Sequence, residues 1–181
     1  MPKVLISDAL SNLATEVFKK NNIEVEVNTE LSPTKLQDVI KNFDGLVVRS
    51  ATKATKEIIE SGNKLKIIGR AGAGVDNINI IAAKKKNIIV MNTPGGNTNA
   101  TAEHTISLLL SLYRSIPKAN VSTHQGLWEK KNFKGLELKG KKIGLIGFGN
   151  VAQRVSEIAK GFDMEVFVFS KSFESRKSNY L

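Results

Sequence analysis

The fold is decided by the stretch Lys142-Ile-Gly-Leu-Ile-Gly147-Phe-Gly149-Asn-Val-Ala152. Its apolar first half predicts a buried strand, and its glycines predict a tight turn directly into a helix. In such a turn the second glycine lets backbone approach a pyrophosphate, which the amides at the helix start then face. The expected cofactor-binding residues are Gly147, Gly149, Asn150, Val151 and Ala152. The alternative is a glycine turn with a purely structural role.

Short apolar runs alternate with amphipathic segments along the whole chain. Apolar runs of this length suit strands that are buried on both faces, as in a parallel sheet. The expected strands are 3–6, 23–27, 45–48, 65–69, 88–91, 143–146 and 165–169, and the expected helices are 11–20, 34–42, 56–61, 79–86, 100–113 and 151–162. This alternation predicts an α/β fold built on doubly wound parallel sheets.

The alternation changes near residue 97, after five expected strands. A long apolar helix follows, then a linking stretch through Trp128, and a second strand-helix-strand unit starts at Lys142. We therefore expect one domain at residues 1–97 and the start of another at residues 98–181. Little chain follows the glycine turn, so the second domain is expected to be incomplete.

The composition excludes several function classes. The 181 residues contain no cysteine, which rules out disulfides and thiolate metal sites, and no cluster of other metal ligands is evident. No run approaches the roughly 18 apolar residues of a membrane helix. The net charge of +10 comes mostly from scattered lysines without interleaved aromatic residues. We expect a soluble cytoplasmic protein without a nucleic-acid or membrane partner.

A second glycine-rich turn, Gly69-Arg-Ala-Gly72-Ala-Gly74-Val-Asp-Asn77, follows the fourth expected strand. Ligands of open α/β sheets bind at the carboxyl ends of strands, and successive backbone amides can hold an anion there. Arg49 and Ser50 end the neighbouring strand, and a guanidinium suits forked contacts to carboxylate or phosphate. The alternative for Arg49 is an ordinary surface residue at a strand end.

One part of the cofactor fingerprint is absent. A carboxylate is expected about 20 residues after the glycines, where it would accept hydrogen bonds from the cofactor ribose. That position reads Phe169-Ser170-Lys171, and Asp163 precedes the strand instead of following it. Because Lys171 and Arg176 stand nearby, NADP is an alternative to NAD. The other interpretation is that both cations are solvated.

Five motifs together resemble one family. They are Val48-Arg49-Ser50-Ala-Thr-Lys53, Gly69-Arg-Ala-Gly-Ala-Gly-Val-Asp-Asn77, Asn92-Thr-Pro-Gly-Gly-Asn97, Thr101-Ala-Glu-His-Thr105 and Gly144-Leu-Ile-Gly-Phe-Gly149. In this order and spacing the chain resembles the D-isomer-specific 2-hydroxyacid dehydrogenases along essentially its whole length. The resemblance implies a flavodoxin-like substrate domain followed by an incomplete Rossmann domain. It also implies hydride transfer between NAD, or NADP, and a 2-hydroxy acid, with 3-phosphoglycerate as the expected substrate at the start of serine biosynthesis.

The resemblance also implies individual roles. The positions that match substrate contacts are Arg49, Ser50, Gly72, Ala73, Gly74, Val75 and Asn97, and Ser170 joins the cofactor positions. Asn150 stands where an arginine is frequent in the family, and Ser170 stands where the ribose aspartate is frequent. Both departures leave the choice between NAD and NADP open.

The catalytic arginine, histidine and glutamate of the family lie beyond Leu181, so no catalytic residue is assigned. His104 and His124 do not match the catalytic histidine motif, and no significant turnover is expected from residues 1–181 alone. Residues 101–138 resemble the dimerisation region, which implies a homodimer for the full-length enzyme. A second hypothesis is a non-catalytic or regulatory module that pairs with a full-length relative through the open edge of strand 143–146.

Overall fold

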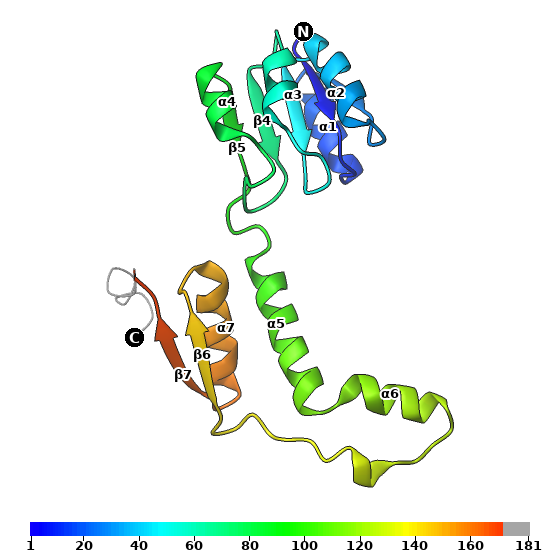
Figure 1. Cartoon of the computed structure of the whole chain (residues 1–181), viewed down its shortest axis with the longest axis vertical. Helices are drawn as coiled ribbons and strands as arrows, with labels where there is room; N and C mark the ends of the chain where they lie inside the picture. Colours follow the sequence, from blue (N-terminus) through cyan, green and yellow to red (C-terminus); the bar gives the residue numbers. More distant parts are fainter. Residues whose placement is uncertain (172–181) are drawn as a thin grey trace. The chain divides into compact units, whose positions relative to one another are not determined.

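A computed structural model describes residues 1–171 of the chain (Figure 1). The chain divides into two compact units, one spanning Met1–Gly96 and one beginning at Asn97, so the division falls one residue before the boundary expected from the sequence. Every strand pair in both units is parallel. Helices flank both sheets, which confirms the predicted α/β fold class.

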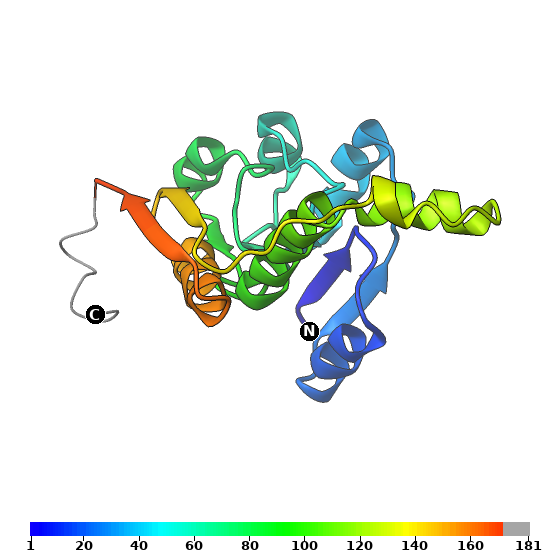
Figure 2. The ribbon, with the colours of Figure 1, turned by 90° about the horizontal axis from the view of Figure 1, so that it is seen from below.

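The first unit contains a five-stranded sheet in the order β2-β1-β3-β4-β5. Its strands are β1 (Lys3–Ile6), β2 (Glu24–Val27), β3 (Gly45–Val48), β4 (Ile67–Arg70) and β5 (Ile89–Met91). Its helices are α1 (Asn12–Lys20), α2 (Pro33–Val39), the short 3₁₀ helix η1 (Ile40–Asn42), α3 (Lys56–Ser61) and α4 (Ile80–Lys85). Figure 2 shows α1 on one side of this sheet and α2, α3 and α4 on the other.

Local sequence explains where the helices of this unit begin. The Ser11 hydroxyl accepts a hydrogen bond from the amide of Leu13 at the start of α1, and Ser32 caps α2 in the same way. Pro33 fits the first turn of α2 because the first amides of a helix have no intrahelical partner. The main core lies between the sheet and α2, α3 and α4, and includes Leu5, Leu46, Val48 and Ile68 with Leu36, Ile40, Ile58 and Ile59.

The strand order of the first unit creates a topological switch point between β1 and β3. After β1 the chain enters α1 on one side of the sheet, whereas after β3 it enters α3 on the other side. Loops that diverge in this way leave a crevice at the carboxyl ends of the strands, where open α/β sheets bind ligands. The loop that carries Arg49 and Ser50 begins at this point.

The second unit is built around a parallel pair of strands. Its elements are α5 (Thr98–Tyr113), α6 (Ile116–His124), η2 (Lys130–Asn132), β6 (Lys142–Ile146), α7 (Asn150–Gly161) and β7 (Glu165–Phe169). The register runs from Lys142 opposite Glu165 to Ile146 opposite Phe169. Ala102 and Ile106 of α5 pack with Val155 of α7 against Ile143 and Leu145 of β6. The two helices therefore cover one face of the strand pair.

The segment after α5 differs from the expectation, because the predicted linking stretch contains helix α6. Pro117 stands in its first turn, which is a favourable position for proline and was the available sequence signal. Ile116 and Val121 are exposed instead of packed in a core. The helix therefore lacks the apolar face on which a sequence-based helix prediction depends.

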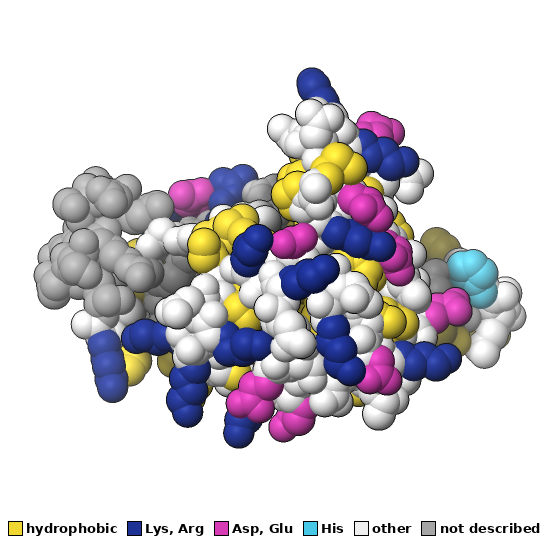
Figure 3. Space-filling model, turned by 90° about the horizontal axis from the view of Figure 1, so that it is seen from above, with side chains coloured by type: hydrophobic (Ala, Val, Ile, Leu, Met, Phe, Trp, Pro, Cys, Tyr) yellow, Lys and Arg dark blue, Asp and Glu magenta, His cyan; other side chains and the backbone are white. Residues whose placement is uncertain are grey.

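Charged side chains do not gather by sign on the face drawn in Figure 3, where lysines and arginines are interspersed with acidic residues. Ion pairs within the first unit include Lys3 with Glu24 and Glu26, and Lys66 with Asp44. Within residues 1–171, none of the helices has both the length and the apolar character that crossing a bilayer requires.

Candidate functional site

Asp8 fixes the loop that carries Arg49 and Ser50. It lies just beyond β1, and only 6% of its surface is exposed. Its carboxylate accepts hydrogen bonds from the amides of Arg49 (2.5 Å) and Thr52 (3.1 Å), and from the Thr52 hydroxyl (2.7 Å). An anchor from β1 therefore holds both ends of residues 49–52 at the switch point.

The environment of Asp8 favours its ionised form. Burial by itself raises the pKa of this carboxyl group, because a charge is less stable away from water. Four hydrogen bonds together outweigh the effect of burial and lower the pKa of Asp8 below the ordinary value of 3.8. They come from the Thr52 hydroxyl and from the amides of Arg49, Thr52 and Ala51. The loop is thus held by a carboxylate that stays charged at neutral pH.

We expect acid to weaken this anchor. Because the pKa of Asp8 is lower in the folded than in the unfolded state, its stabilisation is complete above the unfolded pKa and is lost as pH falls through the folded pKa. Urea unfolding at pH 7 and pH 3, followed by circular dichroism, should show a smaller loss of stability on acidification in Asp8→Asn than in the wild type. Asp44, Glu57 and Asp76, whose pKa values are also lowered, contribute to the remaining dependence in the variant. Equal losses in both proteins would contradict the assignment.

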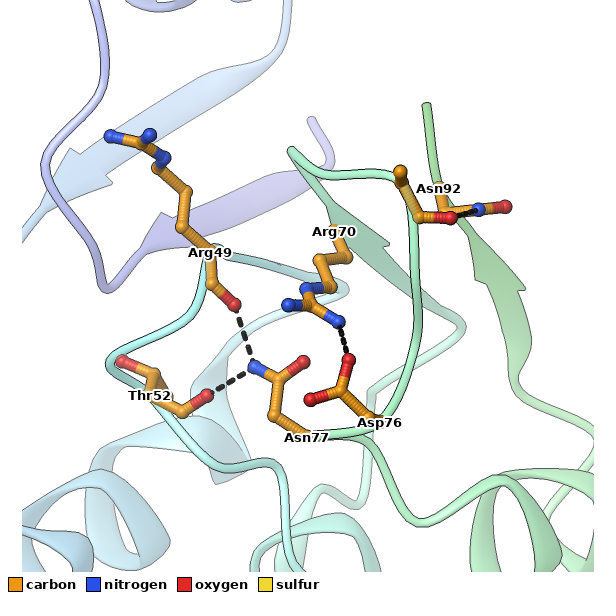
Figure 4. Close-up of polar contacts among 7 residues, drawn as sticks. Arg49, Thr52, Arg70, Asp76, Asn77 and Asn92 are labelled. Carbon is orange, nitrogen blue, oxygen red and sulfur yellow. Dashed lines mark hydrogen bonds and ion pairs between the residues drawn. The ribbon is translucent and has the colours of Figure 1, made fainter. Parts of the chain in front are cut away.

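Asn77 holds the same loop from the side of β4 (Figure 4). Its amide nitrogen donates to the carbonyl oxygens of Arg49 (2.6 Å) and Thr52 (2.5 Å). The Arg49 guanidinium is exposed and donates one hydrogen bond to the Ala9 carbonyl at 3.3 Å. The guanidinium therefore keeps further N–H groups that a ligand could use.

Arg70 is a second guanidinium at this edge of the sheet. It ends β4, its side chain is 13% exposed, and it forms an ion pair with Asp76, which Figure 4 shows beside it. The pKa of Asp76 is lowered, mainly by the hydrogen bond from the Arg70 guanidinium. The backbone amide of Asp76 and the positive charge of Arg70 lower it further. The pair keeps the Arg70 guanidinium in place within the turn that follows β4.

Gly74 makes room for the ion pair between Arg70 and Asp76, whereas a Cβ atom at Gly72 would meet Arg70 only at ordinary contact distance. A Cβ atom at Gly72 would lie 3.4 Å from Arg70 Nε, and one at Gly74 would lie 3.3 Å from Arg70 Nη1 and 3.1 Å from the Asp76 carboxylate. The amides of this turn were the reason for its glycines that the sequence offered, and the structure adds a steric reason at Gly74. The turn is further tied to β5, because Asn92 donates to the Ala73 carbonyl at 2.7 Å (Figure 4).

The structure brings most of the expected substrate residues together. Residues 49 and 50 and the turn at 72–75 lie at the carboxyl ends of the adjacent strands β3 and β4. Asn97 is not in this group, since it belongs to the second unit and precedes α5. The substrate contacts themselves stay a prediction.

Three residues of this edge, Asp8, Arg70 and Asn77, were not among the site residues expected from the sequence. The available signal was their position, since each follows or ends a strand at the edge where ligands bind. Two buried atoms, Arg70 Nε and Asn77 Oδ1, have no hydrogen-bond partner within the part of the chain that the structure describes. Buried polar atoms without partners are uncommon and point to a missing water or ligand.

The second unit presents the predicted glycine turn between β6 and α7. Gly147 has a φ of +94°, which non-glycine residues rarely adopt, and its amide donates to the Phe169 carbonyl at 2.7 Å. Gly149 caps α7 with an ordinary φ of −76°, and a Cβ atom there would meet nothing within 4 Å. The turn is held by buried Gln153, which donates to the Phe148 carbonyl at 2.9 Å.

This turn fits the pyrophosphate of a dinucleotide. The first intrahelical bond of α7 runs from the Gln153 amide to the Gly149 carbonyl, so the amides of Asn150, Val151 and Ala152 precede it. Such amides, at the positive end of the helix dipole, attract phosphate oxygens. Ser170 follows β7 next to the turn, whereas Arg176 lies outside the described residues.

The two histidines belong to other parts of the second unit. His104 lies exposed on α5, and His124 ends α6 with its Nδ1 atom 2.9 Å from the Asn120 carbonyl oxygen. Residues 1–171 contain no group of three histidine or acidic side chains placed to bind a metal ion. Both glycine turns present groups that could bind an anion, namely the guanidinium groups of Arg49 and Arg70 beside the turn at 69–77 and the first backbone amides of α7.

Comparisons with known proteins agree with this geometry. The chain is 46% identical over 167 residues to D-3-phosphoglycerate dehydrogenase of Archaeoglobus fulgidus, covering 92% of this chain and 32% of that protein. It is 47% identical over 168 residues to hydroxypyruvate reductase of Thermotoga maritima, covering 92% and 55%. The solved structure of NAD⁺-bound 3-phosphoglycerate dehydrogenase from Entamoeba histolytica superposes with a TM-score of 0.77 at 36% identity, covering 94% of this chain and 54% of that one.

The chain thus spans between about a third and about half of these proteins. A family model described as "D-isomer specific 2-hydroxyacid dehydrogenase, catalytic domain" matches residues 4–177. Because this match extends over nearly all of the sequence and the two glycine turns occur in the expected places, the chain belongs to the D-isomer specific 2-hydroxyacid dehydrogenase family.

Proposed function

We propose that this chain supplies the anion-binding and pyrophosphate-binding parts of an NAD-dependent dehydrogenase that acts on 3-phosphoglycerate. The observation that carries the substrate assignment is the placement of Arg49, Ser50 and Arg70 at the carboxyl ends of β3 and β4. The substrate bears a carboxylate and a phosphate, and two guanidinium groups at one sheet edge match two anionic groups. The similarity to D-3-phosphoglycerate dehydrogenases of several organisms supports this choice.

A bound nicotinamide cofactor would supply the hydride chemistry. Gly147 gives the turn its shape, Gly149 leaves open space in front of α7, and the amides of Asn150, Val151 and Ala152 are available to the pyrophosphate. We propose that Ser170 lies close to the adenosine ribose. Since no carboxylate stands there to repel a 2′-phosphate, NADP is proposed as a second cofactor.

A titration of the chain with 3-phosphoglycerate tests the substrate assignment. The amide resonances of Arg49, Ser50 and the turn at 72–75 should shift in NMR spectra. Arg49→Gln should weaken binding by about tenfold or more, because it removes a charge-assisted hydrogen bond. Lys64→Gln is the matched control, since it removes a surface cation outside this loop. Unchanged resonances in the wild type at millimolar ligand would reject the proposed substrate.

We also propose that the protein forms a homodimer through α5, α6 and the segment that follows. Leu108, Leu112, Val121 and Trp128 are exposed in this region, and Trp128 is 86% exposed. Apolar side chains gathered in one region are typical of an interface between protein chains. Sedimentation at micromolar concentration should give twice the mass of a single chain.

A further inference from the structure

Two side chains grip opposite polar groups of one loop. Asp8 accepts hydrogen bonds from the amides of Arg49 and Thr52, whereas Asn77 donates to the carbonyl oxygens of these same two residues. Arg49 is the first residue beyond the β3–β4 ladder, which ends at Val48 opposite Arg70. Backbone groups that leave a ladder need other partners, and these two side chains provide them.

We propose that Asp8 and Asn77 are positioning residues, which fix Arg49 and Ser50 in the orientation that an anionic substrate requires. This inference rests on the proposed function and extends it. Asp8 itself is unsuited to contact an anion, because it is a buried carboxylate and would repel one. Its hydrogen-bonding capacity is used on residues 49–52 instead.

The arrangement prepares the loop before a ligand arrives. Arg49 and Ser50 are exposed, so burial contributes little to the order of this part of the loop. The grip comes from two separate elements, the end of β1 and the turn after β4, and acts on both ends of the loop. A flexible loop loses conformational entropy when a ligand orders it. A loop that is already ordered avoids this cost in the binding step, so its affinity is higher without any additional contact to the ligand.

Two conservative substitutions test the two sets of hydrogen bonds separately, one at Asp8 and one at Asn77. Asp8→Asn keeps the size of the side chain but loses its charge and one acceptor, and Asn77→Asp turns the donor into a carboxylate that faces two carbonyl oxygens. Asp44→Asn is the control for Asp8→Asn. Asp44 lies just before β3 and likewise accepts a hydrogen bond from a backbone amide, that of Lys3, but away from the loop. Asn21→Asp is the control for the second, since Asn21 donates to the Val17 carbonyl at the end of α1.

Amide hydrogen exchange, measured by NMR on the whole chain without ligand, tests the grip directly. Exchange at Arg49 and Thr52 should rise about tenfold or more in Asp8→Asn and Asn77→Asp, because one hydrogen bond to a charged or buried partner contributes about that factor. Exchange within β1 and β4 should stay at the wild-type rate, which shows that the sheet is intact. Wild-type exchange at both loop amides in both variants would overturn the proposal.

Titration of the same proteins with 3-phosphoglycerate tests the consequence. Both variants should bind about tenfold more weakly, whereas both controls should stay within about twofold of the wild type. If the loop loosens but affinity is unchanged, the positioning role is wrong. If the wild type itself does not bind, the proposed substrate is wrong, and the exchange rates still decide whether Asp8 and Asn77 hold the loop.

Discussion

Gly149→Ala is expected to weaken NADH binding by about 10- to 100-fold, while the loss of the glycine N-cap lowers the stability of the second unit by no more than about 1 kcal/mol. A Cβ atom at this position meets nothing within 4 Å, and the φ of −76° suits any residue. The folded chain alone therefore gives no steric reason for a glycine, beyond the modest preference for glycine over alanine at an N-cap. A pyrophosphate that approaches the backbone would collide with the added methyl group, which supplies that reason.

Gly147→Ala provides the matched comparison, because its φ of +94° makes alanine strained with or without a ligand. This substitution should destabilise the second unit by about 1–3 kcal/mol. Urea unfolding measures the stability of both variants, and calorimetric or NMR titration with NADH and NADPH measures affinity and cofactor preference. If Gly149→Ala binds NADH and NADPH with wild-type affinity, the glycine turn has only a structural role.

Leu46→Ala is expected to lower the free energy of unfolding of the first unit by about 2–5 kcal/mol. Leu46 lies in the middle of β3, it is completely buried, and it packs in the main core between the sheet and its helices. Truncation leaves a cavity in a region where neighbouring strands cannot close in, so the loss exceeds the hydrophobic transfer energy of the missing atoms.

Leu13→Ala is the control for this prediction, since Leu13 is 62% exposed on α1 and its truncation should change stability by less than about 0.5 kcal/mol. Urea unfolding followed by NMR signals from each unit distinguishes a local from a global effect. The division of the chain into two compact units predicts that Leu46→Ala lowers the midpoint of the first unit and spares the second. Simultaneous unfolding of both units at a lowered midpoint would contradict that expectation.

Most of the fold could be predicted because burial imposes a simple pattern on a parallel sheet. The run 45–48 is apolar, and three of its four residues are buried in β3. The expectation of burial on both faces was wrong for β6 and β7, whose residues alternate between exposed and half-buried because helices cover only one face of this strand pair. Helix α6 escaped prediction because Ile116 and Val121 face away from any core. A helix without a buried face leaves little periodic signal in its sequence.

The amino-acid sequence by itself determined the parallel α/β architecture, the two glycine turns and the family, because these depend on local patterns of apolar residues, glycines and spacing. Only the tertiary structure decided which side chains act together at the glycine turn after β4. Asp8, Arg49 and Asn77 are far apart along the chain, and they meet because β1, β3 and β4 end at the same edge of the sheet. Hydrogen bonds between residues so distant in sequence follow from strand order, which no local pattern encodes.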